Sequence, residues 1–360
     1  MATVPVTQVK LGDKLVEDVL TPLGSVLFHK GKVVTPRELD ILQAFLVPTV
    51  VIDVPDRAQD KEKAAPLPEE LKATIEIKSE LGEQYLLMVK LLKKVYNQTV
   101  SGQSIPVLEL RTQLEALLGY IEEYKVLQFA PHVVQNEEFI QHKSVMVAMS
   151  CYMLAQWVGL PKKDWMQVSL AGLLHDIGNV KIDPTVLYKP DSLSLNELEE
   201  MRRHTVLGYQ LLKNVTAINE GVKLAALQHH ERVDGSGYPL GVAADKIHPY
   251  AKIVAICDIF NAMTMKRAYR KAASPYLVLE QIQKDSFGKL EPSYVQTFIE
   301  KVTQFHNGTI VRLSDDRIGE IVFSDRNHPT RPWVSVNGAI VNLTTERHLY
   351  IEEIMVRGGA

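Results

Sequence analysis

The chain has 360 residues, 46% of them hydrophobic and 23% charged, and a formal net charge of -3. This length favours two or three domains, one of them large enough for a substantial core. The nearly balanced charge excludes a general attraction to nucleic-acid polymers or acidic membranes. Cys151 and Cys257 lie in apolar stretches, no apolar run could span a bilayer, and the first residues lack a leader pattern. We therefore expect a cytoplasmic protein with reduced thiols and no membrane span.

Turn signals, apolar periodicity and alternation divide the chain into five parts. The predicted parts are a small α+β module at 1–56, a linker at 57–70, amphipathic helices at 71–130, a helical domain at 131–305 and a β-rich C-terminal appendage at 306–360. The expected fold class is therefore mainly α, with a helical bundle flanked by two smaller parts.

In the N-terminal module, short β-like runs at 24–28 and 33–34 precede the helix start Thr35-Pro36-Arg37-Glu38. Threonine can cap this helix and Glu38 completes a capping box. The helix should end near residue 46, before a strand at 49–52. The module contains no cluster of catalytic residue types, so we expect a regulatory role with a signalling partner.

Two apolar seams at heptad spacing follow the linker. Their members are Leu81, Tyr85, Met88, Leu92 and Val95, then Val107, Leu110, Leu114, Leu117, Ile121 and Tyr124. One interpretation packs both helices into the main helical core. The other is a homodimer through residues 71–128, since an apolar seam can also be buried against a partner's copy. Glutamate at positions 92 and 117 would then give monomers.

Between residues 131 and 305, the predicted helices carry histidines and aspartates. These helices comprise one with Glu138 and His142 that ends at 157–161, one from Ser169 bearing His175 and Asp176, one at 197–212 with His204, one at 222–230 with the His229-His230 doublet, and one at 251–265 with Asp258. After residue 306 the pattern alternates, and Asn337-Gly338 is typical of a tight hairpin turn.

Apolar segments thus deliver a set of imidazole and carboxylate groups, and burying such groups unpaired is costly. The set is His142, His175, Asp176, His204, His229, His230 and Asp258. Histidine-rich ligation suits iron, manganese or zinc better than magnesium or calcium, and an aspartate can bridge two ions. The alternative is five separately buried histidines, each satisfied by hydrogen bonds. Neither a dinucleotide fingerprint nor a phosphate-binding loop is present in the sequence, so no redox cofactor is expected.

The run His229-His230-Glu231-Arg232-Val233-Asp234-Gly235-Ser236-Gly237-Tyr238-Pro239 follows the His175-Asp176 pair and His204 along the chain. In this order the motifs resemble those of the HD-GYP family of HD-domain phosphohydrolases, over residues 138–270. The resemblance implies a metal-dependent phosphodiesterase with an HD-type helical domain. Its expected substrate is the bacterial second messenger cyclic di-GMP, cleaved to linear pGpG and onward to GMP. Its expected cofactors are two or three divalent ions, iron or manganese.

The resemblance assigns the seven residues of the set as metal ligands, with His175 and Asp176 as the catalytic pair and Asp176 as the bridging carboxylate. Three-metal members have a further glutamate one helical turn before the first histidine, and Glu138 stands there. Substrate contacts are expected from Tyr238, Arg267, Arg270 and Lys181, because cationic side chains bind phosphate and tyrosine offers a ring face to guanine. The glycines at 235 and 237 have an alternative role in a tight turn.

Two positions depart from the family pattern. Asn179 stands where the family has lysine, with Lys181 two residues later, and Asn261 replaces the second carboxylate of an Asp-x-x-Asp run that begins at Asp258. The first change leaves two alternatives open, a sensor that binds a dinucleotide without turnover or a hydrolase of another cyclic dinucleotide. The second change is expected to concern packing or a supporting hydrogen bond.

Overall fold

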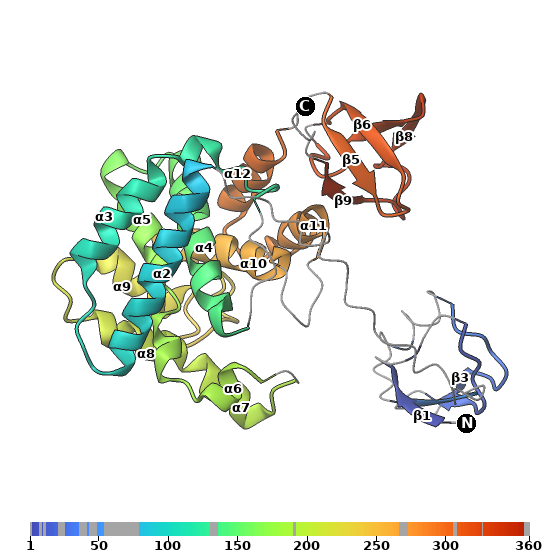
Figure 1. The fold of residues 1–360 in the computed structure, drawn as a ribbon, viewed down its shortest axis with the longest axis horizontal. Helices are drawn as coiled ribbons and strands as arrows, with labels where there is room; N and C mark the ends of the chain where they lie inside the picture. Colours follow the sequence, from blue (N-terminus) through green and yellow to red (C-terminus); the bar gives the residue numbers. More distant parts are fainter. Residues whose placement is uncertain are drawn as a thin grey trace. The chain divides into compact units, whose positions relative to one another are not determined.

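The computed structural model divides into two compact units (Figure 1), Met1–Ala73 and Thr74–Ala360. The residues that the structure describes are 2–6, 9, 12–20, 26–35, 42, 49–53, 79–129, 136–189, 192–265, 273–304, 308–325 and 327–355. The predicted linker at 57–70 lies outside them. Within the described ranges, no helix combines the length and the hydropathy that a membrane span needs.

The N-terminal unit contains two small antiparallel sheets. Strand β1 (Ala2–Pro5) pairs with β4 (Thr49–Ile52), and β2 (Val19–Leu20) pairs with β3 (Val26–Phe28). The predicted strand at 49–52 is therefore confirmed, and the one predicted at 24–28 contains β3. Leu15, Val34, Leu42 and Val50 belong to the core of this unit. Most of the predicted helix at 35–46 lies outside the described residues, with Leu42 in helical conformation.

The second unit is mainly helical and has one large core. Its helices are α2 (Glu80–Val100), α3 (Val107–Leu118), η3 (Ile121–Glu123), η4 (Asn136–Glu138), α4 (Phe139–Trp157), α5 (Lys162–Leu174), η5 (Ile177–Lys181), α6 (Pro184–Leu187), α7 (Leu195–Arg202), α8 (His204–Leu212), α9 (Glu220–Gln228), η6 (Ala244–Lys246), α10 (Pro249–Thr264), α11 (Pro275–Asp285) and α12 (Pro292–Val302). Apolar side chains of α2, α3, α4, α5, α9, α10, α11 and α12 share this core, which confirms the predicted helical bundle. Cys151 and Cys257 are buried in it as free thiols.

Helices α2 and α3 bury their apolar seams inside the chain itself. Helix α2 lies beside α3 and α4 (Figure 1). Leu92 and Leu117 are fully buried, so a glutamate at either position would unfold the core rather than divide a dimer. Exposed apolar side chains on these helices are instead Leu86, Leu87, Val100 and Leu108. The seams therefore serve the core, and a dimer through these helices would use other residues.

The C-terminal appendage is a five-stranded antiparallel sheet with the strand order β8-β7-β6-β5-β9. Its strands are β5 (Ile310–Leu313), β6 (Ile318–Phe323), β7 (Trp333–Val336), β8 (Ala339–Asn342) and β9 (Ile351–Ile354). Asn337 and Gly338 have φ of 50° and 84° in the β7–β8 hairpin, as the motif predicts. The Oγ–H of Ser274 donates to the carbonyl oxygen of Ile351 at 2.5 Å, which joins the sheet to the start of α11.

Candidate metal centre

Helix ends, rather than helix interiors, deliver most of the candidate ligands. Helix α5 ends at Leu174, so His175 and Asp176 form the connection to η5 and do not lie in a helix that begins at Ser169. The predicted single helix at 197–212 is also wrong, because it is broken at Arg203 and His204 begins α8. Asp258 comes from the middle of a helix, α10, and His142 from within the first turn of α4. Turns at helix ends let neighbouring ligands point into one place without a shared helical face.

Backbone hydrogen bonds fix the orientation of three histidines. The Nδ1–H of His175 donates to the carbonyl oxygen of Gly172 at 2.7 Å, that of His204 to Met201 at 2.7 Å, and that of His229 to Ala225 at 3.0 Å. A carbonyl oxygen can only accept, so Nδ1 must carry the proton in each ring. A ring that is neutral then presents the lone pair of Nε2 toward the centre of the site, which is the tautomer a metal ligand needs.

Two of these lone pairs face each other. Nε2 of His204 lies 3.2 Å from Nε2 of His229, and both rings already donate through Nδ1. Two acceptors at this separation repel unless a cation lies between them. Nitrogens bound to one tetrahedral ion at about 2.1 Å are about 3.4 Å apart. The pair therefore fits a common divalent ion.

Asp176 divides its two oxygens between two groups of side chains. Its Oδ1 lies 3.4 Å from Nε2 of His204 and 3.8 Å from Nε2 of His229. Its Oδ2 lies 3.3 Å from Nε2 of His175, which is also 3.2 Å from Oδ1 of Asp258. In the described part of the chain, potential ligand atoms converge in two groups, His204 with His229 and His230, and His175 with Asp176 and His229. One carboxylate thus faces different histidines through each of its two oxygens.

Burial and charge act differently on the two groups. Burial lowers the pKa of His204, takes that of His229 well below its ordinary value and lowers the pKa of His230 to about 3. These three rings are therefore neutral near pH 7 and able to bind a metal. Burial also opposes charge on His175, but Asp176 and Asp258 outweigh it and raise its pKa to about 9. The first group thus offers nitrogen lone pairs to a metal ion. In the second group, cationic side chains already neutralise the charge of the carboxylates.

Lys143 is the second cationic group, and it is absent from the predicted set. Its Nζ lies 2.6 Å from Oδ2 of Asp176 and 2.6 Å from Oδ1 of Asp258, with the side chain 11% exposed. Burial opposes its charge, but the two carboxylates outweigh it and hold the pKa of Lys143 above its ordinary value. In turn His175 and Lys143 hold the pKa of Asp176 and that of Asp258 well below their ordinary values, despite burial.

Glu138 and His142 lie outside both groups. The carboxylate of Glu138 accepts from Nζ of Lys93 at 2.5 Å and is 37% exposed. Nδ1 of His142 is 2.7 Å from the hydroxyl of Tyr85 on α2. Helix α4 directs adjacent side chains about 100° apart. His142 therefore faces α2, while Lys143 faces the carboxylates.

The Gly-Tyr-Pro loop is built on a buried carboxylate. Glu231 is 3% exposed, and its oxygens accept from the backbone N–H groups of Leu240 at 2.7 Å and Val242 at 3.2 Å. Gly235 has φ +79°, and a Cβ at Gly237 would lie 2.4 Å from the backbone nitrogen of Arg232. Both glycines are therefore required by the tight turn, as the alternative interpretation of the sequence predicts. The loop places Tyr238 against the site.

Tyr238 stacks on His230 of the first group. Its ring centroid is 4.7 Å from that of His230 with 17° between the planes, and the guanidinium carbon of Arg202 lies 5.1 Å from the same tyrosine centroid. Together with Lys143, Asp176 and Asn179, Tyr238 lines a pocket of about 300 Å³ over the ligands. An aromatic wall beside cationic groups suits a planar base joined to phosphate.

The structure places the other residues singled out in the sequence in different surroundings. Asn179 is 6% exposed, and its Oδ1 has no hydrogen-bond partner among the described residues. Lys181 ends η5 and is exposed. Asn261 is fully buried and donates to the carbonyl oxygen of Cys257 at 2.8 Å, which agrees with the expected packing role. Arg267 and Arg270 lie outside the described residues.

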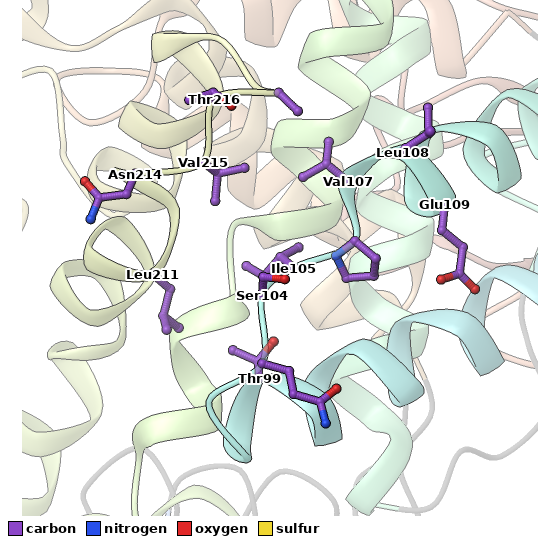
Figure 2. Close-up of a pocket in the computed structure, with 13 residues that line it drawn as sticks. Thr99, Ser104, Ile105, Val107, Leu108, Glu109, Leu211, Asn214, Val215 and Thr216 are labelled. Atoms are coloured by element: carbon purple, nitrogen blue, oxygen red, sulfur yellow. The ribbon is translucent and has the colours of Figure 1, made fainter.

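A larger cavity of about 750 Å³ lies elsewhere, between the α2–α3 connection and the end of α8. In Figure 2, Leu211, Asn214 and Val215 lie on one side of it and Ile105 and Val107 on the other. Among the described residues that line it, Glu109 is the one titratable group, and it is paired with Lys94. The smaller pocket is lined by Asp176, His204 and His230 of the converging set, so we take that pocket as the functional site.

The sequence does contain a signal for Lys143, but none for Arg202. Lys143 stands three and four residues from Ile140 and Val147 in a nearly continuous apolar helix, and a lysine on such a face must find buried anions. Arg202 carries no such signal, because α7 is a polar helix and the place of this arginine beside Tyr238 depends on tertiary packing.

Comparison with known proteins finds a matching domain family and similar sequences. Residues 129–292 match the model of the HD domain family. A cyclic di-GMP phosphodiesterase of Pseudomonas aeruginosa is 32% identical over 187 residues, which are 52% of this chain and 45% of that protein. A 3'3'-cGAMP-specific phosphodiesterase of Vibrio cholerae is 32% identical over 160 residues, 44% of this chain and 31% of that protein. The chain thus spans less than half the length of either relative.

The architecture also has a solved counterpart. An HDG"Y"P protein from Bdellovibrio bacteriovorus aligns with 82% of this chain and 97% of that chain, with a TM-score of 0.50 and 17% identity. At this identity the likeness concerns the fold alone. The HD domain match contains the His175-Asp176 pair, the histidines and the Gly-Tyr-Pro run in the order described above, so residues 129–292 form an HD domain whose motifs resemble those of the HD-GYP family.

Proposed function

We propose that the protein is a metal-dependent phosphodiesterase that hydrolyses cyclic di-GMP to linear pGpG and onward to GMP. The observation that carries this proposal is the pair of Nε2 lone pairs, on His204 and His229, that face each other at 3.2 Å beside Oδ1 of Asp176. This arrangement suits a divalent ion at the floor of a pocket with an aromatic wall. The name of the Pseudomonas relative supports a cyclic dinucleotide as the substrate.

A divalent ion bound there supplies Lewis acidity to the phosphodiester and to the attacking water. His204, His229 and His230 would hold it through neutral rings, while Asp176 presents one oxygen to each cation position. His175 and Asp176 form the proposed catalytic pair, and Asp258 completes the second group. Buried and aligned by their Nδ1–H bonds, the histidines need little rearrangement as the reaction proceeds.

Substrate contacts are proposed on one side of the pocket. The ring of Tyr238, in contact with His230 and Arg202, offers a stacking face for a base. Arg267 and Arg270, assigned by the resemblance, would bind phosphate through bidentate hydrogen bonds, with Lys181 as a further cation. The unpartnered Oδ1 of buried Asn179 is a hydrogen-bond acceptor at the pocket wall, as far as the described residues go.

Iron or manganese is the proposed metal, because imidazole-rich ligation with one bridging carboxylate suits these ions. The resemblance allows two or three ions. Its assignment of His142 and Glu138 as ligands stays a prediction, and these side chains bind Tyr85 and Lys93 in this structure.

Two other functions retain specific support. A sensor that binds the dinucleotide without turnover is favoured by Asn179, which replaces the lysine of the family pattern. A hydrolase of another cyclic dinucleotide is favoured by the name of the Vibrio relative. Both use the same pocket, so product analysis separates them.

Assembly and location are further proposals. A homodimer through residues 71–128 would use exposed Leu86, Leu87 and Leu108 instead of the buried seams. The 1–56 module is the proposed site for a signalling partner. Free, buried Cys151 and Cys257 support a reducing compartment such as the cytoplasm.

The test is anaerobic purification, metal analysis and chromatography of products from cyclic di-GMP, 3'3'-cGAMP and cyclic di-AMP. We expect pGpG from cyclic di-GMP in the wild type and none from His175→Ala or Asp176→Ala. His328→Ala removes an exposed histidine that bonds Asp325 in the C-terminal appendage, and it is the matched control with unchanged turnover. Binding without any product in the metal-loaded wild type would establish the sensor instead. Wild-type turnover in Asp176→Ala with unchanged metal content would contradict the proposed site.

A further inference from the structure

Lys143 occupies the space between two carboxylates where a metal ion of the second group would lie. Its Nζ is 2.6 Å from both Oδ2 of Asp176 and Oδ1 of Asp258. These are the same two oxygens that Nε2 of His175 approaches at 3.3 and 3.2 Å. A divalent ion bound by these carboxylates would lie about 2.0–2.2 Å from each oxygen. Ion and ammonium would then share one small, buried volume.

The placement follows from the helix rather than from a flexible surface side chain. Lys143 is buried on α4, as are nearby Gln141 and Ser144, and its side chain is 11% exposed. Adjacent residues on a helix diverge by about 100°, so the ring of His142 cannot reach the same carboxylates while it bonds Tyr85. Withdrawing the ammonium would leave two buried carboxylates with His175 as the cation nearest to both, and removal of one partner from a buried charge cluster is strongly destabilising.

We propose that Lys143 is a tethered cation that takes the place of one metal ion between Asp176 and Asp258. The chain then binds a single divalent ion, on the side of His204, His229, His230 and Oδ1 of Asp176. Two positive centres still flank the bridging carboxylate, one exchangeable and one covalently fixed. The inference rests on the proposed function and deepens it, because it specifies the metal content of the same site.

The ammonium also differs chemically from the ion that it replaces. Lys143 lines the pocket beside Tyr238, so its remaining N–H is available to a phosphate oxygen of the substrate. It can donate a hydrogen bond and supply charge, but it cannot lower the pKa of a coordinated water as a metal does. The fixed cation therefore acts in substrate positioning.

The experiment counts Mn²⁺ per chain. Purified wild type, Lys143→Met, Lys143→His and His142→Gln are stripped with chelator, dialysed against Mn²⁺ and analysed by mass spectrometry for metal and by absorbance for protein. We expect one ion in the wild type and in His142→Gln, and one more in both Lys143 variants. The His142 variant separates two assignments, since the family resemblance makes His142 a metal ligand and the tethered cation excludes that role. Unchanged counts in both Lys143 variants, or a lost ion in His142→Gln, would overturn the inference.

Thermal unfolding keeps the test informative if Lys143→Met is unstable. Without metal this variant should melt below the wild type, and Mn²⁺ should raise its melting temperature more than it raises that of the wild type. Equal shifts in the two proteins would count against the tethered cation. Failure of the proposed function has a different signature, namely no product from cyclic dinucleotides while the metal counts follow the expectation.

Discussion

Gly178 lies directly against the backbone of His204, with no room for a side chain between them. A Cβ atom at position 178 would be 1.9 Å from the carbonyl oxygen of His204 and 2.5 Å from the amide nitrogen of Gly208. This contact holds η5 against α8. Because Asp176 directly precedes η5 and His204 begins α8, the contact sets the spacing of a carboxylate and an imidazole in the metal centre.

Gly178→Ala is therefore expected to destabilise the fold and weaken metal binding together. Overpacking in a closed space costs about 1–3 kcal/mol and more when backbone must move, so we expect a loss at or above the upper value. Urea unfolding and Mn²⁺ titration measure both effects. Gly208→Ala is the matched control, since its Cβ would meet Gly178 at 3.3 Å and requires only a small adjustment. Equal stability of the two variants would contradict the contact described.

His229→Gln should abolish tight metal binding with little effect on the fold. Loss of a supporting partner of a ligand costs about 10- to 100-fold in affinity, and loss of the ligand itself should cost more. Isothermal titration with Mn²⁺ measures the change. His248→Gln is the control, because His248 caps α10 through the N–H of Tyr250 at 3.1 Å. Its loss should lower stability by about 1 kcal/mol and leave metal affinity unaltered. Unaltered Mn²⁺ affinity in His229→Gln, with weakened affinity in His248→Gln, would show that His229 is not a metal ligand.

Comparing Tyr238→Phe with Tyr238→Ala should separate the contribution of the aromatic ring to substrate binding from that of the hydroxyl. The ring contacts His230 and Arg202, so phenylalanine keeps both contacts and should retain KM within about twofold. Alanine removes a stacking surface worth about 1–3 kcal/mol per base, which corresponds to roughly a 5- to 150-fold rise in KM. Steady-state kinetics on cyclic di-GMP, with metal content measured in parallel, checks this. An equally large KM in the phenylalanine variant would assign the effect to the hydroxyl.

Glu197 makes a pH-dependent contribution to the stability of the fold. Its carboxylate accepts from Lys189 at 2.7 Å and from the N–H of Ser194 at 2.7 Å, which lowers its pKa to about 2 from 4.5. A depressed acid stabilises the fold above its unfolded pKa and loses that contribution as the pH falls from 4.5 toward 2.

Glu197→Gln should accordingly melt below the wild type at pH 7, and the difference should shrink as the pH is lowered through 4.5. High salt should reduce it too, because the pair is partly exposed. Glu199→Gln removes the same charge from an exposed position of α7 and is the control. A difference in melting temperature that is constant between about pH 7 and about pH 3.5 would argue against the ion pair.

Much of the site could be predicted because its chemistry is carried by residue type and order. Histidines and aspartates in apolar segments must be satisfied, and packing alone does not require the run of polar groups and glycines from His229 to Pro239. Six residues of the predicted set, His175, Asp176, His204, His229, His230 and Asp258, converge around the pocket. Periodicity also identifies the bundle, because each helix buries an apolar face.

The limits of prediction have equally physical causes. Periodicity does not reveal that α5 ends one residue before His175, since the apolar pattern continues through the break. Neighbouring His142 and Lys143 are both compatible with a ligand face, and only the packing of α4 decides which one reaches the carboxylates. The sequence does not predict strand β9, because residues 351–354 do not alternate clearly and the strand is defined by its partner β5.

The contacts between the C-terminal sheet and α11 determine where the protein can be truncated without damage to the helical domain. Tyr276 of α11 is 1% exposed because it packs in the core of the sheet, and Arg331 binds Glu280 on the same helix through paired bonds of 2.5 and 2.7 Å. Helix α11 begins shortly after the segment that holds Arg267 and Arg270. A fragment ending at residue 305 would expose the side chain of Tyr276 and remove the arginine that pairs with Glu280. Helix α11 would then lose its contacts with the sheet. Low activity in such a fragment would then report a damaged scaffold and not an inactive enzyme.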